Sequence, residues 1–199
     1  MSSKSETLDS FFVRPTAVLI IDVQNDFVKN KGKMYSPSYK SIIAPIQRLL
    51  KVAREVKVPE IYVRHVYPPD YVGLALFSRS KKLGALKRGT WGAQIIDEIK
   101  PTGGDPVIEK QRYSGFYNTN LEIILRGLDI KTLIVTGIMT NVCVESTIRD
   151  AHARDYHAIL ISDCTASISK EMHEATLKRM PSFCMVSTSE EAIKLITEK

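Results

Sequence analysis

The most informative stretch of the chain is Thr132-Leu133-Ile134-Val135-Thr136-Gly137-Ile138-Met139-Thr140-Asn141-Val142-Cys143. Its apolar, β-branched start predicts a buried strand over 132–135, and the pattern that follows predicts a helix over 144–154. Thr140 is positioned to cap that helix, so that Cys143 lies in its first turn. Unpaired N–H groups and the helix dipole favour a thiolate there. The stretch therefore predicts a reactive cysteine at the carboxyl end of a strand.

Strand and helix signals alternate along the rest of the chain. Right-handed crossovers between such strands give a parallel sheet that is covered by helices on both faces. We therefore predict an α/β fold with a six-stranded parallel sheet. The expected strands are 17–21, 61–66, 106–109, 132–135, 158–161 and 183–186, and the expected helices are 42–53, 95–99, 119–127, 144–154, 169–180 and 188–196.

The length of 199 residues suits one domain with a full core. Residues 1–13 are expected to form a flexible N-terminal lead, and residues 14–199 a single domain. The stretch 67–90 is longer than most compact connections, which makes it a candidate lid or partner-contact segment.

Charge and composition exclude several classes of function. The net charge is +6, but the basic residues are spread among 22 acidic ones, so no nucleic-acid partner is expected. No apolar run approaches the roughly 18 residues of a membrane span, so no membrane partner is expected either. Three cysteines without a CxxC pair favour a reducing, cytoplasmic location.

Two further charged residues occupy strand ends that match the position of Cys143. Asp22 follows the strand 17–21, and Lys110 follows the strand 106–109. The carboxyl ends of parallel strands meet at one edge of a sheet, where ligands bind. Asp22 is then a proton acceptor for the thiol, Lys110 stabilises the charged forms, and the backbone N–H groups of Met139 and Cys143 are candidate oxyanion donors. This set predicts an activated cysteine nucleophile.

Other interpretations remain open for the same residues. A lone cysteine is most often an apolar filler of the core, and a strand-end Asp or Lys often only caps a turn or faces solvent. A thiol redox sensor would also use Cys143, with Cys164 as a resolving cysteine. A catalytically silent binding protein is a third class, in which the Cys143 thiol has an ordinary pKa.

Three motifs carry a resemblance to the isochorismatase-like cysteine hydrolases. They occur in the family's order and span about residues 15 to 190. The first is Ile20-Ile21-Asp22-Val23-Gln24-Asn25-Asp26-Phe27, the second Lys110-Gln111-Arg112-Tyr113-Ser114-Gly115-Phe116, and the third Gly137-Ile138-Met139-Thr140-Asn141-Val142-Cys143-Val144-Glu145-Ser146-Thr147.

The resemblance implies a three-layer, Rossmann-like fold and an Asp22, Lys110, Cys143 triad that hydrolyses its substrate through a thioester. It also implies a cis peptide bond, which here would be Ile138–Met139. Members of the family commonly assemble as dimers or tetramers, so a homo-oligomer is expected.

Local sequence narrows the branch of the family that the chain resembles. Gly89-Thr90-Trp91-Gly92 and the stretch 112–119 are similar to the ureidoacrylate and N-carbamoyl amidohydrolases. A small amide or ureido substrate is therefore expected, with nicotinamidase or isochorismatase activity as the alternative. Nicotinamidases hold a metal through an Asp-x-His pair, which His65 lacks, so neither metal nor cofactor is expected. The candidate substrate-binding residues are Phe27, Trp91, Tyr113 and Ile138.

Overall fold

The computed structural model describes residues 7–76 and 84–198 of the chain. Its strands form a single parallel sheet in the order β3-β2-β1-β4-β5-β6, which confirms the predicted α/β class and sheet. The strands are β1 (Thr16–Ile21), β2 (Glu60–His65), β3 (Val107–Lys110), β4 (Thr132–Ile138), β5 (His157–Ala166) and β6 (Met185–Ser187).

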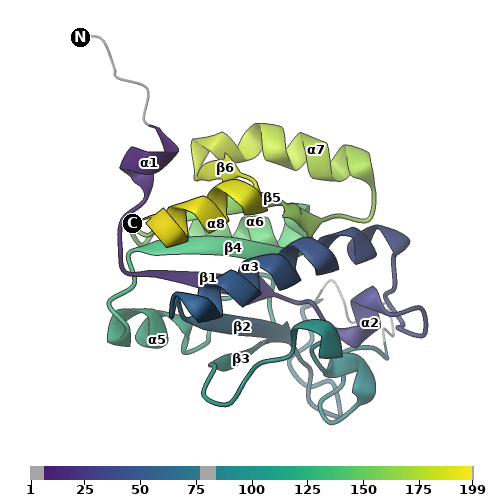
Figure 1. Cartoon of the computed structure of the whole chain (residues 1–199). Helices are drawn as coiled ribbons and strands as arrows, with labels where there is room; N and C mark the ends of the chain where they lie inside the picture. The colour runs from purple at the N-terminus through teal and green to yellow at the C-terminus, as the bar shows by residue number, and fades with distance from the viewer. Residues whose placement is uncertain (1–6, 77–83, 199) are drawn as a thin grey trace.

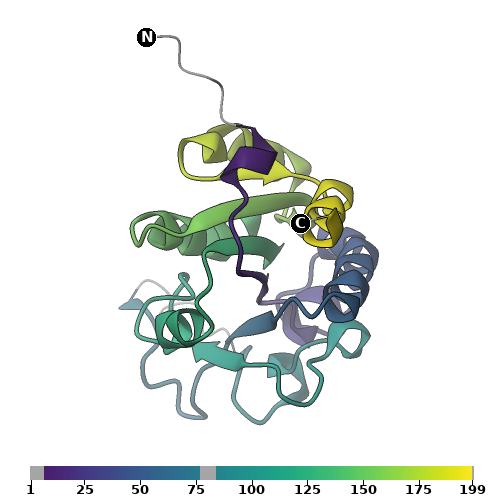
Figure 2. The ribbon, with the colours of Figure 1, turned by 60° about the vertical axis from the view of Figure 1, so that its left-hand side comes forward.

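Helices cover both faces of this sheet, so the molecule has three layers (Figures 1 and 2). The residues of β1 alternate between two apolar cores, with Val18 and Ile20 in one and Leu19 and Ile21 in the other. The first core packs against α3 and α8, and the second against α5, α6 and α7. These helices are α3 (Ile43–Glu55), α5 (Leu121–Gly127), α6 (Glu145–His152), α7 (Lys170–Arg179) and α8 (Ser189–Glu198).

The strand order reverses at β1, which lies between β2 and β4. In open α/β sheets the crevice at such a reversal is where ligands bind, because the connections leave it in opposite directions. Residues 22 and 139–144 follow the two strands that flank this crevice.

Gly137 lets β4 approach β1 closely at that crevice. It pairs with Ile21 and has a φ of +110°, a backbone conformation that residues other than glycine rarely adopt. A Cβ atom at Gly137 would lie 2.0 Å from the Ile21 carbonyl oxygen, so no other residue fits without moving the backbone. The Ile138–Met139 peptide bond that follows is cis.

Several local predictions differ from the structure. Residues 8–11, within the expected flexible lead, form the short helix α1 (Leu8–Phe11), and Phe12 is buried against the first core. The expected lead is therefore helical over this part, while residues 1–6 lie outside the described residues. The helix expected over 95–99 is only the 3₁₀ turn η3 (Asp97–Ile99), because Pro101 leaves it no room.

The remaining elements are short turns that connect the layers. None of the helices in the described part of the chain combines the length and apolar character needed to cross a bilayer. The short elements are α2 (Asn25–Val28), η1 (Pro37–Ile42), η2 (Trp91–Ala93), η4 (Thr140–Val144) and η5 (Met180–Ser182).

Candidate active site

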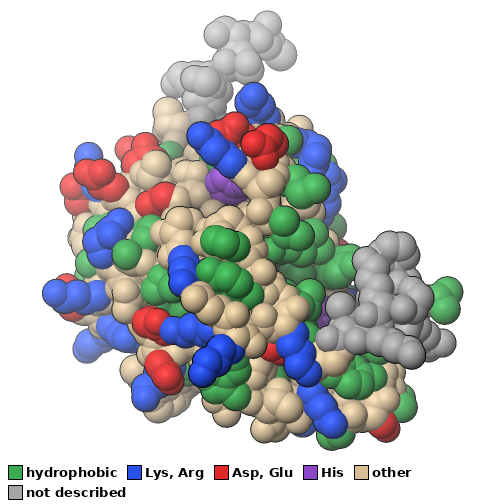
Figure 3. Space-filling model, turned by 90° about the vertical axis from the view of Figure 1, so that its right-hand side faces the viewer, with side chains coloured by type: hydrophobic (Ala, Val, Ile, Leu, Met, Phe, Trp, Pro, Cys, Tyr) green, Lys and Arg blue, Asp and Glu red, His purple; other side chains and the backbone are tan. Residues whose placement is uncertain are grey.

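The structure brings Asp22, Lys110 and Cys143 together at the carboxyl edge of the sheet. Asp22 follows β1 in a left-handed conformation, with φ of 56°, that turns the chain sharply. Lys110 is the last residue of β3, and Cys143 lies in η4 just after β4. Figure 3 looks onto this edge of the molecule, where hydrophobic side chains gather near the middle with Lys and Arg side chains around them.

Cys143 is held by one π-helical turn rather than by the start of a regular helix. The N–H of Val144 bonds the carbonyl of Met139 at 3.2 Å, five residues back. Thr140 does not cap this turn as predicted, because its hydroxyl is 2.8 Å from His173 Nδ1 on α7. Single π turns of this kind are frequent at functional sites.

Lys110 and Asp22 form an ion pair that is removed from solvent. Lys110 Nζ donates to Asp22 Oδ2 at 2.6 Å, and both side chains are at most 1 % exposed. The ammonium also donates to the Arg112 carbonyl at 3.2 Å and lies 3.3 Å from His65 Nδ1. Three acceptors therefore surround one ammonium group.

Burial sets the protonation of the Cys143 thiol. It raises the pKa of Cys143 to about 12, although the neighbouring Lys110 ammonium opposes this. The sequence predicts a resting thiolate, whereas burial favours the protonated thiol of Cys143. Burial also raises the pKa of Asp22, against the effect of Lys110. Burial alone would lower the pKa of Lys110, but the Asp22 carboxylate, which accepts the Lys110 hydrogen bond, outweighs it, so that this pKa is raised.

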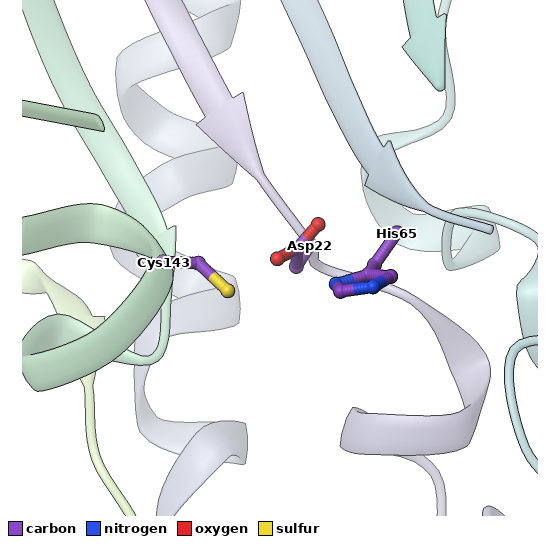
Figure 4. Close-up of side chains that lie close together, drawn as sticks. All are labelled: Asp22, His65 and Cys143. Atoms are coloured by element: carbon purple, nitrogen blue, oxygen red, sulfur yellow. The ribbon is translucent and has the colours of Figure 1, made fainter. Parts of the chain in front are cut away.

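His65 completes the cluster from the end of β2. Figure 4 shows its ring and the Cys143 side chain on opposite sides of Asp22. One donor atom from each of these three residues lies within 4.8 Å of the others, so the set has the composition of a metal site. The Lys110 ammonium, however, already lies against Asp22 and His65, and a divalent cation would have to sit beside that fixed charge.

Gln24 supports the site through hydrogen bonds that the sequence analysis did not predict. Its buried amide donates to the carbonyls of His65 and Ala93, at 3.0 and 2.9 Å. Its side-chain oxygen accepts the N–H of His65 at 2.8 Å. Gln24 therefore ties the end of β2 and the 91–93 turn to the residues after β1. It lies inside the first quoted motif, which was the available signal.

The four predicted substrate-binding residues differ in their exposure. Trp91 and Tyr113 are about half exposed, at 48 % and 49 %. Phe27 is buried, with its ring 6.4 Å from that of Tyr39. The Ile138 side chain is fully buried in the first core, so only its backbone faces the turn that holds Cys143.

Cys164 is not placed to resolve an oxidised Cys143. Cys143 packs in the second core and Cys164 in the first, so the sheet lies between them.

The candidate lid 67–90 is described at its two ends, where Tyr67 bridges to Lys87, while residues 77–83 lie outside the described residues.

Comparison with known proteins places this geometry in a family. Residues 16–191 match the model of the Isochorismatase domain. The chain is 33 % identical over 190 residues to the ureidoacrylate amidohydrolase of Rhizobium rhizogenes, covering 84 % of this chain and 77 % of that protein. It is 32 % identical over 190 residues to the ureidoacrylate amidohydrolase of Acinetobacter baylyi, covering 84 % and 78 %.

Solved structures show the same fold. A cysteine hydrolase from Pseudomonas syringae superposes with a TM-score of 0.89 at 33 % identity, covering 92 % of each chain. The N-carbamoylsarcosine amidase of Thermoplasma acidophilum superposes with a TM-score of 0.76 at 30 % identity, covering 88 % of this chain and 96 % of that one.

Proposed function

This chain belongs to the isochorismatase family, and from that premise we propose that it is a cysteine amidohydrolase acting on a small amide or ureido substrate. The observation that carries the proposal is the buried contact of Lys110 with Asp22 beside the Cys143 thiol, at the strand-order reversal. Relatives named as ureidoacrylate amidohydrolases and an N-carbamoylsarcosine amidase support the ureido class.

The first half of the proposed reaction forms a thioester. Asp22 takes the Cys143 proton as sulfur attacks the substrate carbonyl carbon, and the carbonyl oxygen becomes an oxyanion. Asp22 Oδ1 has no hydrogen-bond partner in the described part of the chain, so it is available for that proton. The backbone N–H groups of Met139 and Cys143 bind the oxyanion. The carbon–nitrogen bond then breaks, and the departing nitrogen takes the proton from Asp22.

The second half releases the product. Asp22 takes a proton from water as the water oxygen attacks the thioester carbon, and the carbon–sulfur bond breaks. The proton returns to sulfur, which restores the thiol. Lys110 holds the Asp22 carboxylate in place through both halves, since the ammonium stabilises its charged form.

Ammonia release tests this proposal directly. The purified protein would be incubated with ureido acids, simple carboxamides and nicotinamide, and ammonia measured. We expect turnover of ureido acids, and we expect acid-quenched protein to carry a covalent adduct on Cys143 by mass spectrometry. Turnover that persists in Cys143→Ala, or an adduct on another cysteine, would contradict the mechanism. The matched control is Cys184→Ala, since that thiol comes directly before β6, an outer strand three positions from β1 in the sheet.

The proposal extends to location and assembly. Three free cysteines favour a reducing compartment, so we place the enzyme in the cytoplasm. We also propose a homo-oligomer, which the exposed apolar side chains of Val72 and Leu76 support. Analytical ultracentrifugation of the purified chain checks the assembly, and a purely monomeric sample would contradict it.

A further inference from the structure

His65 carries a buried nitrogen without a partner beside the nucleophile. The residue is 5 % exposed, and its Nε2 has no hydrogen-bond partner in the part of the chain that the structure describes. His157 also has an unpartnered ring nitrogen, but it is only half-buried and opens β5 at the other end of the sheet. Buried polar atoms normally find partners, so an unpaired one beside a reactive thiol points to a ligand.

The hydrogen of the His65 ring can be assigned from its neighbour. Lys110 Nζ lies 3.3 Å from Nδ1, and an ammonium group is only a donor. Nδ1 must therefore be the acceptor, and the hydrogen of a neutral ring is on Nε2. Burial lowers the pKa of His65 well below its usual value, and the charges of Lys110 and Arg112 lower it further. The ring is therefore neutral at pH 7, with one N–H donor to offer.

The position of His65 separates its role from that of the oxyanion donors. The Met139 and Cys143 N–H groups follow β4, whereas His65 ends β2, on the other side of Asp22 (Figure 4). A substrate whose carbonyl carbon faces sulfur therefore presents its remaining part to His65. The positive charges of Lys110 and Arg112 both act on the His65 ring. Arg112 donates only to backbone carbonyls and has no carboxylate partner among the described residues, so the surroundings of His65 favour an anionic substrate group.

We propose that His65 Nε2–H donates a hydrogen bond to a substrate carboxylate oxygen that is remote from the scissile carbonyl. This bond makes ureido or amido acids the preferred substrates. This inference rests on the proposed amidohydrolase function and deepens it. It predicts that the donor contributes to binding the acid in both the ground state and the transition state, so that KM changes more than kcat.

Two substitutions separate the donor from the Lys110 contact. His65→Asn keeps an acceptor near the Nδ1 position for Lys110 and removes the Nε2 donor, while His65→Gln returns an amide donor near the Nε2 position. The substrates are 3-ureidopropionate and N-propylurea, which differ mainly in the carboxylate. For His65→Asn we expect KM for the acid to rise roughly 10- to 100-fold. Little change is expected in kcat or in the pH profile, or in the kinetics with N-propylurea. His65→Gln should recover part of the loss in KM for the acid.

Other outcomes overturn the inference. An equal loss on both substrates would assign His65 to the reacting group, and a shifted pH profile with unchanged KM would assign it only to support of Lys110. His152→Asn, at the exposed end of α6, controls for loss of a histidine ring away from the site. Imidazole ¹⁵N spectra at pH 7 must also show the Nε2–H tautomer of His65; an imidazolium or the Nδ1–H tautomer contradicts the assignment.

A binding measurement separates this test from the test of the proposed function. Absence of turnover by the wild type would end the hydrolase proposal and leave the binding claim to calorimetry. In a Cys143→Ala background, 3-ureidopropionate should bind roughly 10- to 100-fold more weakly when His65→Asn is added. Equal binding with and without the second substitution, or no binding to Cys143→Ala, overturns the role of His65.

Discussion

The two ends of the sheet each hold a buried carboxylate next to a cation, but only one pair is sealed from water. At the amino end of β2, Glu60 accepts from Arg54 at 2.8 Å and from the Tyr62 hydroxyl at 2.7 Å, and the Arg54 side chain is 42 % exposed. At the carboxyl end, Asp22 and Lys110 are both fully buried. A solvated cation suits a structural pair, while a sealed pair keeps its charges strong for chemistry on a neighbouring thiol.

The largest effect on turnover is expected from substitution of Cys143, at the carboxyl end of the sheet. Cys143→Ala should lower kcat by at least about 10³-fold, because no other group forms the thioester. Its melting temperature should change little. Cys164→Ala should do the reverse, costing about 1–2 kcal/mol of unfolding free energy by opening the first core, while turnover persists. Steady-state kinetics and thermal unfolding of both variants measure this contrast.

The sealed pair should be costly to break. Lys110→Met leaves the Asp22 carboxylate buried without its cation, so we expect a loss of about 3–5 kcal/mol of unfolding free energy. Urea unfolding measures it, and the double variant Asp22→Asn with Lys110→Met should recover part of the loss. A single variant as stable as wild type would show that solvent reaches the pair.

The pH profile should report the burial of Asp22. The reaction needs the carboxylate, and the pKa of Asp22 is raised above its ordinary 3.8 by burial. The acid limb of kcat/KM should therefore lie above pH 3.8, with about tenfold loss per pH unit below it. The contribution of Asp22 to the free energy of unfolding depends on pH in the opposite direction to activity. The raised pKa favours the folded state most below the ordinary value, and that contribution is lost as pH rises through the folded pKa. An acid limb at or below the ordinary value would contradict this account.

The smallest effect is expected at the amino end. Arg54→Met removes a half-exposed cation, and the Tyr62 hydroxyl still donates to Glu60. We expect a loss of about 1 kcal/mol or less, with kcat unchanged. The same urea unfolding experiment measures it, and a loss equal to that of Lys110→Met would remove the distinction between the two ends.

The sheet and the gathering of Asp22, Lys110 and Cys143 at one edge were predictable, whereas the contacts around them were not. Runs such as 132–135 are apolar on both faces, so they predict buried parallel strands, and strand ends predict a common edge. The role of Thr140 was not predictable, because its partner His173 lies 33 residues away. The protonation of Cys143 depends on how many groups exclude water, and the contact of Gln24 with His65 spans 41 residues. Water exclusion leaves no local pattern in the chain, and the place of Gln24 inside the first motif does not identify His65 as its partner.

The Asp22–Lys110 contact joins residues 88 positions apart, and Lys110 belongs to β3, one of the two outer strands of the sheet. Contacts between distant parts of a chain close late, because their loop entropy must be overcome first. During refolding, recovery of turnover should therefore report the docking of that outer strand. Emission from Trp91, the single tryptophan, can report an earlier event, and a lag between the two signals would time the last step of assembly.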